Sequence, residues 1–159
     1  MNAFITILFM ILVPGTMLVL LPSYLVGNDP ALFSFSIFRW LAVPLWAAGA
    51  AAMVWCARVF VVHGQGTPLP TQPPRKLMTR GLYRMIRNPI YLGAVIFLLG
   101  FVFWHPASSI LGMPIIVAIS AHLFVILYEE PHLRKAFGSE YEQYCRNVPR
   151  WFPEWRKTK

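Results

Sequence analysis

The strongest constraint on the fold of this chain is the length of its apolar runs. Three runs contain no charged residue, namely Ala3–Val26, Ile90–Trp104 and Ala107–Tyr128, and a fourth, Ile37–Val62, has only one arginine near each end. About 20 consecutive apolar residues cross a bilayer as a helix. The chain is 13% charged, against about 25% for a soluble domain. The sequence therefore predicts an all-α, polytopic membrane protein with about four transmembrane helices.

The basic residues predict how these helices are oriented. Five lie in the loop 63–88 and seven in the tail after Tyr128, whereas the turn at 105–106 has no Lys or Arg. Lys and Arg stay on the cytosolic side of a membrane, so we expect a multi-pass protein with both termini cytosolic. The lack of a eukaryotic targeting signal fits a bacterial inner membrane. Attraction to anionic membrane lipids explains the net charge of +8 without a nucleic-acid partner.

The chain is predicted to form a single domain, residues 1–159, in two sections. Residues 1–62 supply two N-terminal spans, and residues 63–159 supply a loop, a hairpin of two spans and a helical tail. The loop is too rich in Pro and Gly to be a continuous helix. In the tail, Pro131 and Gly138 suit the start and end of one short helix. Ser139 and Glu142 fit a capping box for the next helix.

The border between the loop and the third span, "RNPIYLG", has two interpretations. Asn is a strong helix N-cap and Pro is favoured at the next position, so Asn88–Pro89 predicts the cytosolic start of a helix. A helix start also attracts anions through its unpaired N–H groups and its dipole. With Arg87 beside it, and Tyr83 and Tyr91 flanking it, this site could hold a carboxylate or a phosphate.

The end of the fourth span, "YEEP", places two carboxylates where a helix carries partial negative charge. Pro131 is expected to push Glu130 out of helical geometry. A cation must compensate Glu129 and Glu130, either arginines of the loop, in purely structural ion pairs, or a cationic ligand. His122, seven residues before Glu129, is expected on the same helical face. It could hydrogen-bond to a neighbouring helix or contact a substrate.

The sequence contains no spacing of Cys and His typical of a zinc site, and no nucleophile elbow, phosphate loop or dinucleotide fingerprint. No metal is therefore expected. We expect one cytosolic pocket that opens toward lipid, formed by the anion-binding helix start, the tyrosines, the arginines and the two glutamates. Such a pocket would suit a zwitterionic, water-soluble ligand brought to a membrane-embedded acceptor.

These motifs are similar to those of a known family. "GLYRMIRNPIYLG", followed by a hydrophobic hairpin and "YEEPHLRKAFGSEYEQYCRNVPRWFP", resembles the isoprenylcysteine carboxyl methyltransferase and phospholipid N-methyltransferase group of integral membrane enzymes. The resemblance runs from Gly66 to Pro153. It implies S-adenosylmethionine as the cofactor, in a pocket enclosed by the loop and the end of the fourth span. The implied cofactor-binding residues are Arg75, Lys76, Leu77, Met78, Tyr83, Asn88, Pro89, Ile90, Tyr91, Glu129 and Glu130.

The implied reaction is methyl transfer to a lipophilic small molecule, a lipid or a lipid-modified substrate at the cytosolic membrane interface. The candidate catalytic residues are Arg87, Glu129 and His122, and either a carboxylate or His122 would take the proton of an amine acceptor. Two residues depart from the isoprenylcysteine branch: Asn88 replaces a histidine, and Val125 replaces a substrate-binding arginine. An amine-bearing lipid headgroup is therefore at least as well supported as a prenylated protein. The sequence leaves the oligomeric state open.

Two alternatives to a methyltransferase remain open at this point. The first is a membrane reductase that uses a nicotinamide cofactor, because sterol reductases have a similar C-terminal half. The second is a non-catalytic membrane protein in which Arg87 and the glutamates form a structural ion network.

Overall fold

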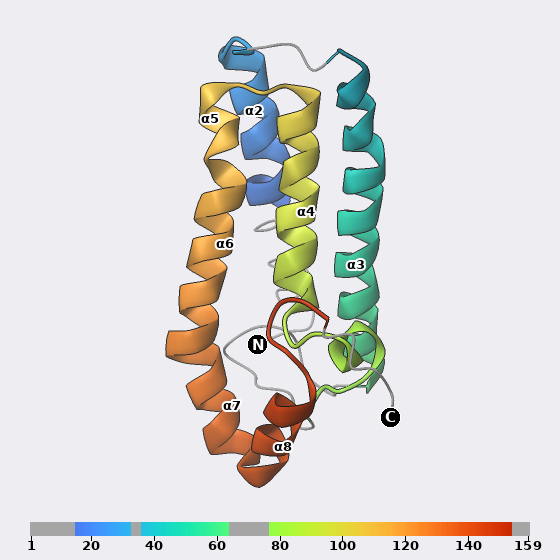
Figure 1. The fold of residues 1–159 in the computed structure, drawn as a ribbon, viewed down its shortest axis with the longest axis vertical. Helices are drawn as coiled ribbons and strands as arrows, with labels where there is room; N and C mark the ends of the chain where they lie inside the picture. Colours follow the sequence, from blue (N-terminus) through green and yellow to red (C-terminus); the bar gives the residue numbers. More distant parts are fainter. Residues whose placement is uncertain (1–14, 33–35, 64–76, 154–159) are drawn as a thin grey trace. The chain divides into compact units, whose positions relative to one another are not determined.

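The computed structural model describes residues 15–32, 36–63 and 77–153 (Figure 1). These residues form helices joined by short connections, and their only β-type contact is an isolated bridge between Ala31 and Ala107. The prediction of an all-α protein is confirmed. The chain divides into two compact units, residues 1–51 with 93–119 and residues 52–92 with 120–159. The division falls within three helices, α3 (Ala42–His63), α4 (Pro89–Trp104) and α6 (Met113–Phe124).

The described residues of the first unit form seven helical segments. In chain order these are the π-helical η1 (Thr16–Leu20), α2 (Leu21–Asn28), the 3-10 helix η2 (Ser36–Leu41), the first part of α3 (Ala42–His63), most of α4 (Pro89–Trp104), α5 (Ser108–Leu111) and the first part of α6 (Met113–Phe124). Within the unit α2 lies against α5. Small residues bring α3 and α4 together: a Cβ atom added to Gly49 would lie 2.6 Å from the carbonyl oxygen of Gly93. Close backbone approach through glycine is typical of helix pairs in membranes.

One end of the first unit is tied by Asp29, which follows α2. Its Oδ2 accepts hydrogen bonds from Ser108 Oγ (2.9 Å) and Ser109 N (3.0 Å) at the start of α5. The ring Nε2 of His105 lies 2.9 Å from the backbone oxygen of Asp29. The hydrogen bonds from Ser109 and Ser108 lower the pKa of Asp29 below its ordinary value of 3.8. The aspartate thus caps a four-residue helix that has no cap of its own.

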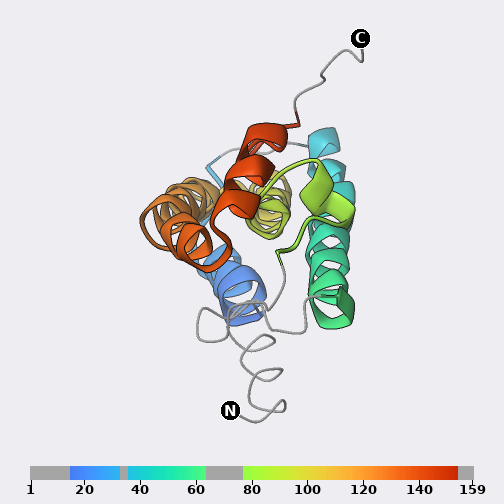
Figure 2. The same ribbon diagram turned by 90° about the horizontal axis from the view of Figure 1, so that it is seen from below.

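The second unit contains the rest of α3, the segment 77–88 with the 3-10 helix η3 (Gly81–Arg84), the first turn of α4, the end of α6, the π-helical η4 (Val125–Glu129), α7 (Glu130–Phe137) and α8 (Ser139–Asn147). Gly138, at φ +52°, reverses the chain between α7 and α8. Helix α8 lies beside α7 (Figure 2). One face of α8 buries Tyr141 and Tyr144 against residues of α7 and Leu77. A second cluster joins Cys56 of α3 to Met78 and Tyr83.

Two expectations for the tail are wrong. Glu130 does not leave helical geometry, because its φ of −61° and ψ of −44° are those of an α-helix, and the chain continues from η4 into α7. The wider π turn makes room for the ring of Pro131, which in a regular α-helix clashes with the carbonyl four residues earlier. Ser139 does not cap α8 either. Gly138 is at that position without a side-chain hydrogen bond, and Glu142 pairs instead with Arg134.

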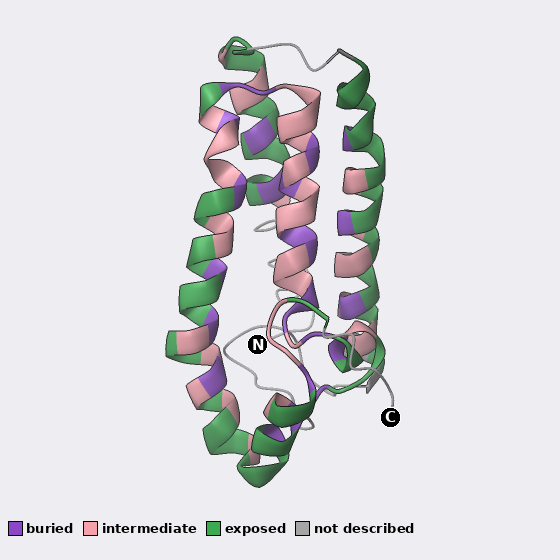
Figure 3. Ribbon diagram, in the orientation of Figure 1, coloured by how far each residue is buried: buried purple, intermediate pink, exposed green. Residues whose placement is uncertain are grey.

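Two helices among the described residues are long and apolar enough to cross a membrane, Ile37–Val59 and Ser108–Phe137. Two shorter apolar helices cover Thr16–Asn28 and Pro89–Trp104, so four spans remain a prediction. Large apolar side chains lie exposed along the helix Ile37–Val59 and along α6, and the exposed residues are green in Figure 3. On α6 they include Ile115, Ile116 and Ile119. Exposed apolar surface of this extent is typical of a protein that contacts lipid.

Candidate functional site

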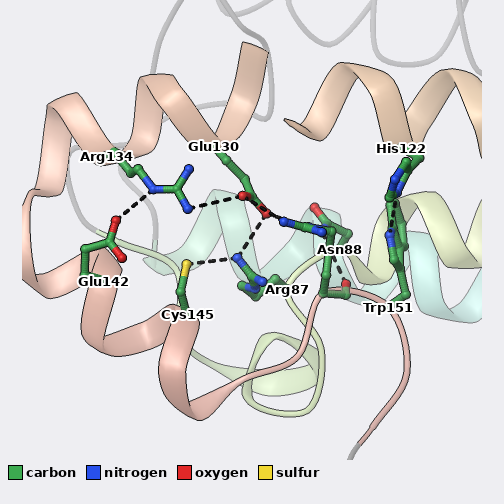
Figure 4. Close-up of polar contacts among 9 residues, drawn as sticks. Arg87, Asn88, His122, Glu130, Arg134, Glu142, Cys145 and Trp151 are labelled. Carbon is green, nitrogen blue, oxygen red and sulfur yellow. Dashed lines mark hydrogen bonds and ion pairs between the residues drawn. The ribbon is translucent and has the colours of Figure 1, made fainter. Parts of the chain in front are cut away.

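The polar centre of the second unit is Glu130, the first residue of α7 (Figure 4). Its carboxylate accepts from Arg87 Nη1 (3.0 Å) and from Arg150 Nε and Nη2 (2.7 and 3.1 Å), and it lies 3.5 Å from Arg134 Nη2. The side chain of Glu130 is 4% exposed, and that of Arg87 is 11% exposed. Three arginines therefore neutralise one buried carboxylate, as a buried charge requires. The glutamate in turn raises the pKa of Arg150.

Arg87 joins the network to α8 as well as to α7. Its Nη1 also donates to Cys145 Sγ, 2.9 Å away. Its Nε atom is buried and has no hydrogen-bond partner among the described residues. Burial of a donor without an acceptor is costly, so this nitrogen is a place where a bound group could contribute an acceptor.

The tail after α8 lies across the start of α4. The backbone N–H of Arg87 donates to the carbonyl of Pro149 (2.9 Å), and Asn88 Nδ2 donates to the carbonyl of Arg150 (3.2 Å). Asn88 and Pro89 therefore begin α4 as predicted, and the amide of Asn88 additionally binds the tail. Because the side chain of Arg150 also donates to Glu130, residues 149–150 connect the starts of α4 and α7.

Glu129 differs from Glu130 in its partners. Its Oε2 accepts a hydrogen bond from the hydroxyl of Tyr91 (3.0 Å), and it forms no ion pair with any residue in the described part of the chain. The ring of Tyr91 packs edge-on against Phe124, with centroids 6.5 Å apart. Neighbouring helical residues point in different directions, which is why one glutamate faces the arginines while the other faces Tyr91. A half-buried carboxylate without a cation is suited to bind a cationic ligand.

The seven-residue spacing from His122 to Glu129 does not by itself place the two side chains on one helical face. The π-helical η4 lies between them, and a π turn contains about one residue more than an α turn, so α-helical periodicity no longer applies. His122 is exposed, and its Nδ1 lies 3.0 Å from Trp151 Nε1, as the right side of Figure 4 shows.

The other candidate cofactor residues have varied surroundings. Met78 and Tyr83 are buried in the cluster with Cys56, and Ile90 packs against that cluster. Burial raises the pKa of Tyr83. Leu77 packs against the aromatic face of α8. Arg75 and Lys76 lie outside the described residues.

Sequence reasoning missed four contributors to this site: Arg134, Cys145, Arg150 and Trp151. Arg134 carried a detectable signal, because it lies four residues after Glu130 on one helix, where opposite charges pair. The other three depend on a reversal of the chain at Gly138 and on the path of the tail after α8. Spacing along the sequence carries no information on that path.

Comparison with known proteins gives a consistent set of relatives. A family model described as phospholipid methyltransferase matches residues 37–140, more than half of the chain. Methanethiol S-methyltransferase 1 of Bradyrhizobium diazoefficiens is 36% identical over 88 residues, which cover 54% of this chain and 28% of that protein. Protein-S-isoprenylcysteine O-methyltransferase B of Arabidopsis thaliana is 34% identical over 80 residues, 49% of this chain and 40% of that protein.

A probable protein-S-isoprenylcysteine O-methyltransferase of Oryza sativa is similar to the same degree, with 35% identity over 80 residues, 49% of this chain and 41% of that protein. The chain thus spans less than half of the length of each of these curated relatives.

Proposed function

The chain belongs to the phospholipid methyltransferase family, and on this premise we propose that it is a membrane methyltransferase that uses S-adenosylmethionine. The family resemblance read from the "RNPIYLG" and "YEEP" motifs is thereby confirmed. The proposed acceptor is a lipophilic molecule, a lipid or a lipid-modified substrate that reaches the site from the membrane at its cytosolic face. The family match does not favour the reductase alternative.

The observation that carries the proposal is the contrast between the two glutamates. Glu130 has the structural ion network that the non-catalytic alternative requires. Glu129 has no cation in the described part of the chain, although the next residue, Glu130, pairs with three arginines. Glu129 accepts a hydrogen bond from Tyr91 instead. A structural network alone does not explain an uncompensated carboxylate in this position.

The donor set fits S-adenosylmethionine. The cofactor is a zwitterion with a sulfonium, and Glu129 could pair with its ammonium or stabilise its sulfonium. The buried Nε of Arg87 has no acceptor among the described residues and could donate to the carboxylate of the cofactor. Tyr91 offers both a hydroxyl to Glu129 and a ring face. When bound, the cofactor supplies an electrophilic methyl group to the acceptor.

The protein's own contribution is to orient both partners and to exclude water. Tyr91 holds one oxygen of Glu129, so that the carboxylate presents its other oxygen in a defined direction. The tail at 149–150, tied to Asn88 and Glu130, keeps α4 and α7 together at this place. Arg150 therefore acts as a positioning residue.

The three relatives and the family model name three classes of acceptor: a thiol, a prenylated cysteine and a phospholipid. Val125 bears on the choice between them. It is buried and apolar, with 1% of its surface exposed, so this position provides no cation for a carboxylate. We therefore place a thiol or an amine headgroup ahead of a prenylcysteine carboxylate.

Calorimetry on the purified chain in detergent tests the proposal. The parent is expected to bind S-adenosylmethionine and not a reduced nicotinamide cofactor, and Glu129→Gln is expected to lose that binding while it remains folded. Methyl transfer is then measured with methanethiol, an S-prenylated cysteine analogue and phosphatidylethanolamine vesicles. A folded parent that does not bind S-adenosylmethionine would overturn the proposal.

A further inference from the structure

The contact between His122 and Trp151 has chemical consequences beyond the proposed cofactor site. Trp151 is the fourth residue after α8, and each of the three residues before it is held by a hydrogen bond. The N–H of Val148 donates to the carbonyl of Tyr144, the carbonyl of Pro149 accepts from Arg87, and Arg150 binds through both its backbone and its side chain. The hydrogen bonds of residues 148–150 therefore fix the position of the indole beside His122.

The direction of the hydrogen bond determines the state of the imidazole. An indole N–H can only donate. The atom that receives it, His122 Nδ1 at 3.0 Å, must therefore offer a lone pair and cannot carry a proton. A neutral imidazole has one N–H and one lone pair, so the proton of His122 is on Nε2.

We infer that Trp151 is a positioning residue that holds His122 as the Nε2–H tautomer, so that His122 donates a hydrogen bond to the methyl acceptor and does not take its proton. Nδ1 is occupied by the indole, and Nε2 already carries a hydrogen. Neither nitrogen can accept a proton while the contact lasts. This rests on the proposed function, and it replaces the expectation that His122 is the base for an amine acceptor.

The inference also describes the substrate. The group that meets His122 must have a lone pair, such as an oxygen of a phosphate or an ester in a lipid headgroup. The side chains of Leu123 and Phe124, which follow His122, are exposed and apolar. A donor beside apolar surface suits a molecule with a polar head and a hydrophobic body.

Nitrogen NMR on the full chain in detergent micelles tests the tautomer directly. The protein is labelled with 15N-histidine, and the signals of His122 are assigned from their loss in His122→Gln. We expect Nε2 to be protonated and Nδ1 to be bare in the parent, and a Nδ1–H population to appear in Trp151→Phe, which keeps a ring but has no N–H. Phe152→Leu, a change at the exposed next residue, is the matched control and should leave the signals in place. A proton on Nδ1 in the parent, or identical spectra for the parent and Trp151→Phe, would overturn the inference.

Kinetics separate a donor from a base with the acceptor that proves active in the panel above. Loss of one hydrogen bond weakens binding by about 3- to 10-fold, so His122→Leu should raise the KM for the acceptor by that factor and leave kcat within a few-fold. His122→Gln, which retains an N–H donor near the position of Nε2, should restore most of the loss. A fall in kcat of about 100-fold or more in both variants is the signature of a general base and would contradict the donor role. The NMR result does not depend on turnover, so a failure of the proposed function and a failure of this inference are distinguishable.

Discussion

Replacement of Glu130 by glutamine should destabilise the protein far more than the same change at Glu129. Glu130 is 4% exposed and Arg87, its most buried partner, is 11% exposed. Glu130→Gln removes the charge but retains the shape, so it leaves the guanidinium of Arg87 buried with the neutral side chains of Cys145 and Tyr141 beside it and no carboxylate. Removal of one partner from a buried ion pair costs about 3–5 kcal/mol.

The other two arginines change this figure little. The side chains of Arg134 and Arg150 are 45% and 31% exposed, and exposed pairs contribute about 0–1 kcal/mol. For a chain of this size, 1 kcal/mol corresponds to about 2–4 °C in Tm. Glu130→Gln is therefore expected to lower Tm by roughly 6–20 °C.

Glu129→Gln is the matched control for this prediction. Glu129 accepts a hydrogen bond from the neutral hydroxyl of Tyr91 and forms no ion pair among the described residues, and a glutamine oxygen can accept the same bond. Its Tm should change by no more than about 2–4 °C, whereas cofactor binding is lost. Unfolding in detergent is followed by tryptophan fluorescence for both variants. Equal losses of stability, or a larger loss for Glu129→Gln, would refute the division of roles between the two glutamates.

Three further predictions concern the fold. Gly49→Ala should lower the free energy of unfolding by about 1–3 kcal/mol, because the added Cβ would lie 2.6 Å from a backbone oxygen of α4. The control is Gly27→Ala, whose added Cβ meets nothing within 4 Å and should not destabilise the protein. Denaturant titration compares the two variants. Tyr144→Phe removes a buried 2.7 Å hydrogen bond to the carbonyl of Tyr83 and should cost about 1 kcal/mol in the same titration; an unchanged midpoint would contradict it. Asp29 has a lowered pKa, so it stabilises the folded protein fully above its ordinary pKa of 3.8, and this stabilisation is lost as the pH falls through the folded-state pKa. Asp29→Asn should therefore flatten the dependence of Tm on pH in that acidic range. Parallel curves of Tm against pH for the parent and the variant would refute this.

Much of the helical framework could be predicted from the sequence, because the signals are local. Asn88–Pro89 begins α4, and Gly138 separates α7 from α8, as their backbone preferences indicate. One prediction for the tail was wrong because a rule about proline in regular α-helices was applied to a helix that contains a π turn. Pro131 was expected to end helical geometry, yet a π turn just before it allows the helix to continue. The same turn breaks the α-helical periodicity between His122 and Glu129.

The sequence by itself determined the helical class, the membrane-compatible apolar runs, the family and the two motifs that meet at the candidate site. Only the tertiary structure decided which glutamate is neutralised and which remains available. Adjacent helical residues point in different directions, and the partners of Glu130 lie 43 residues before it and 20 residues after it in the chain. The same holds for His122, whose tautomer is set by an indole 29 residues away. Contacts between distant parts of the chain depend on how helices and tail pack, and no pattern of spacing within one segment contains that information.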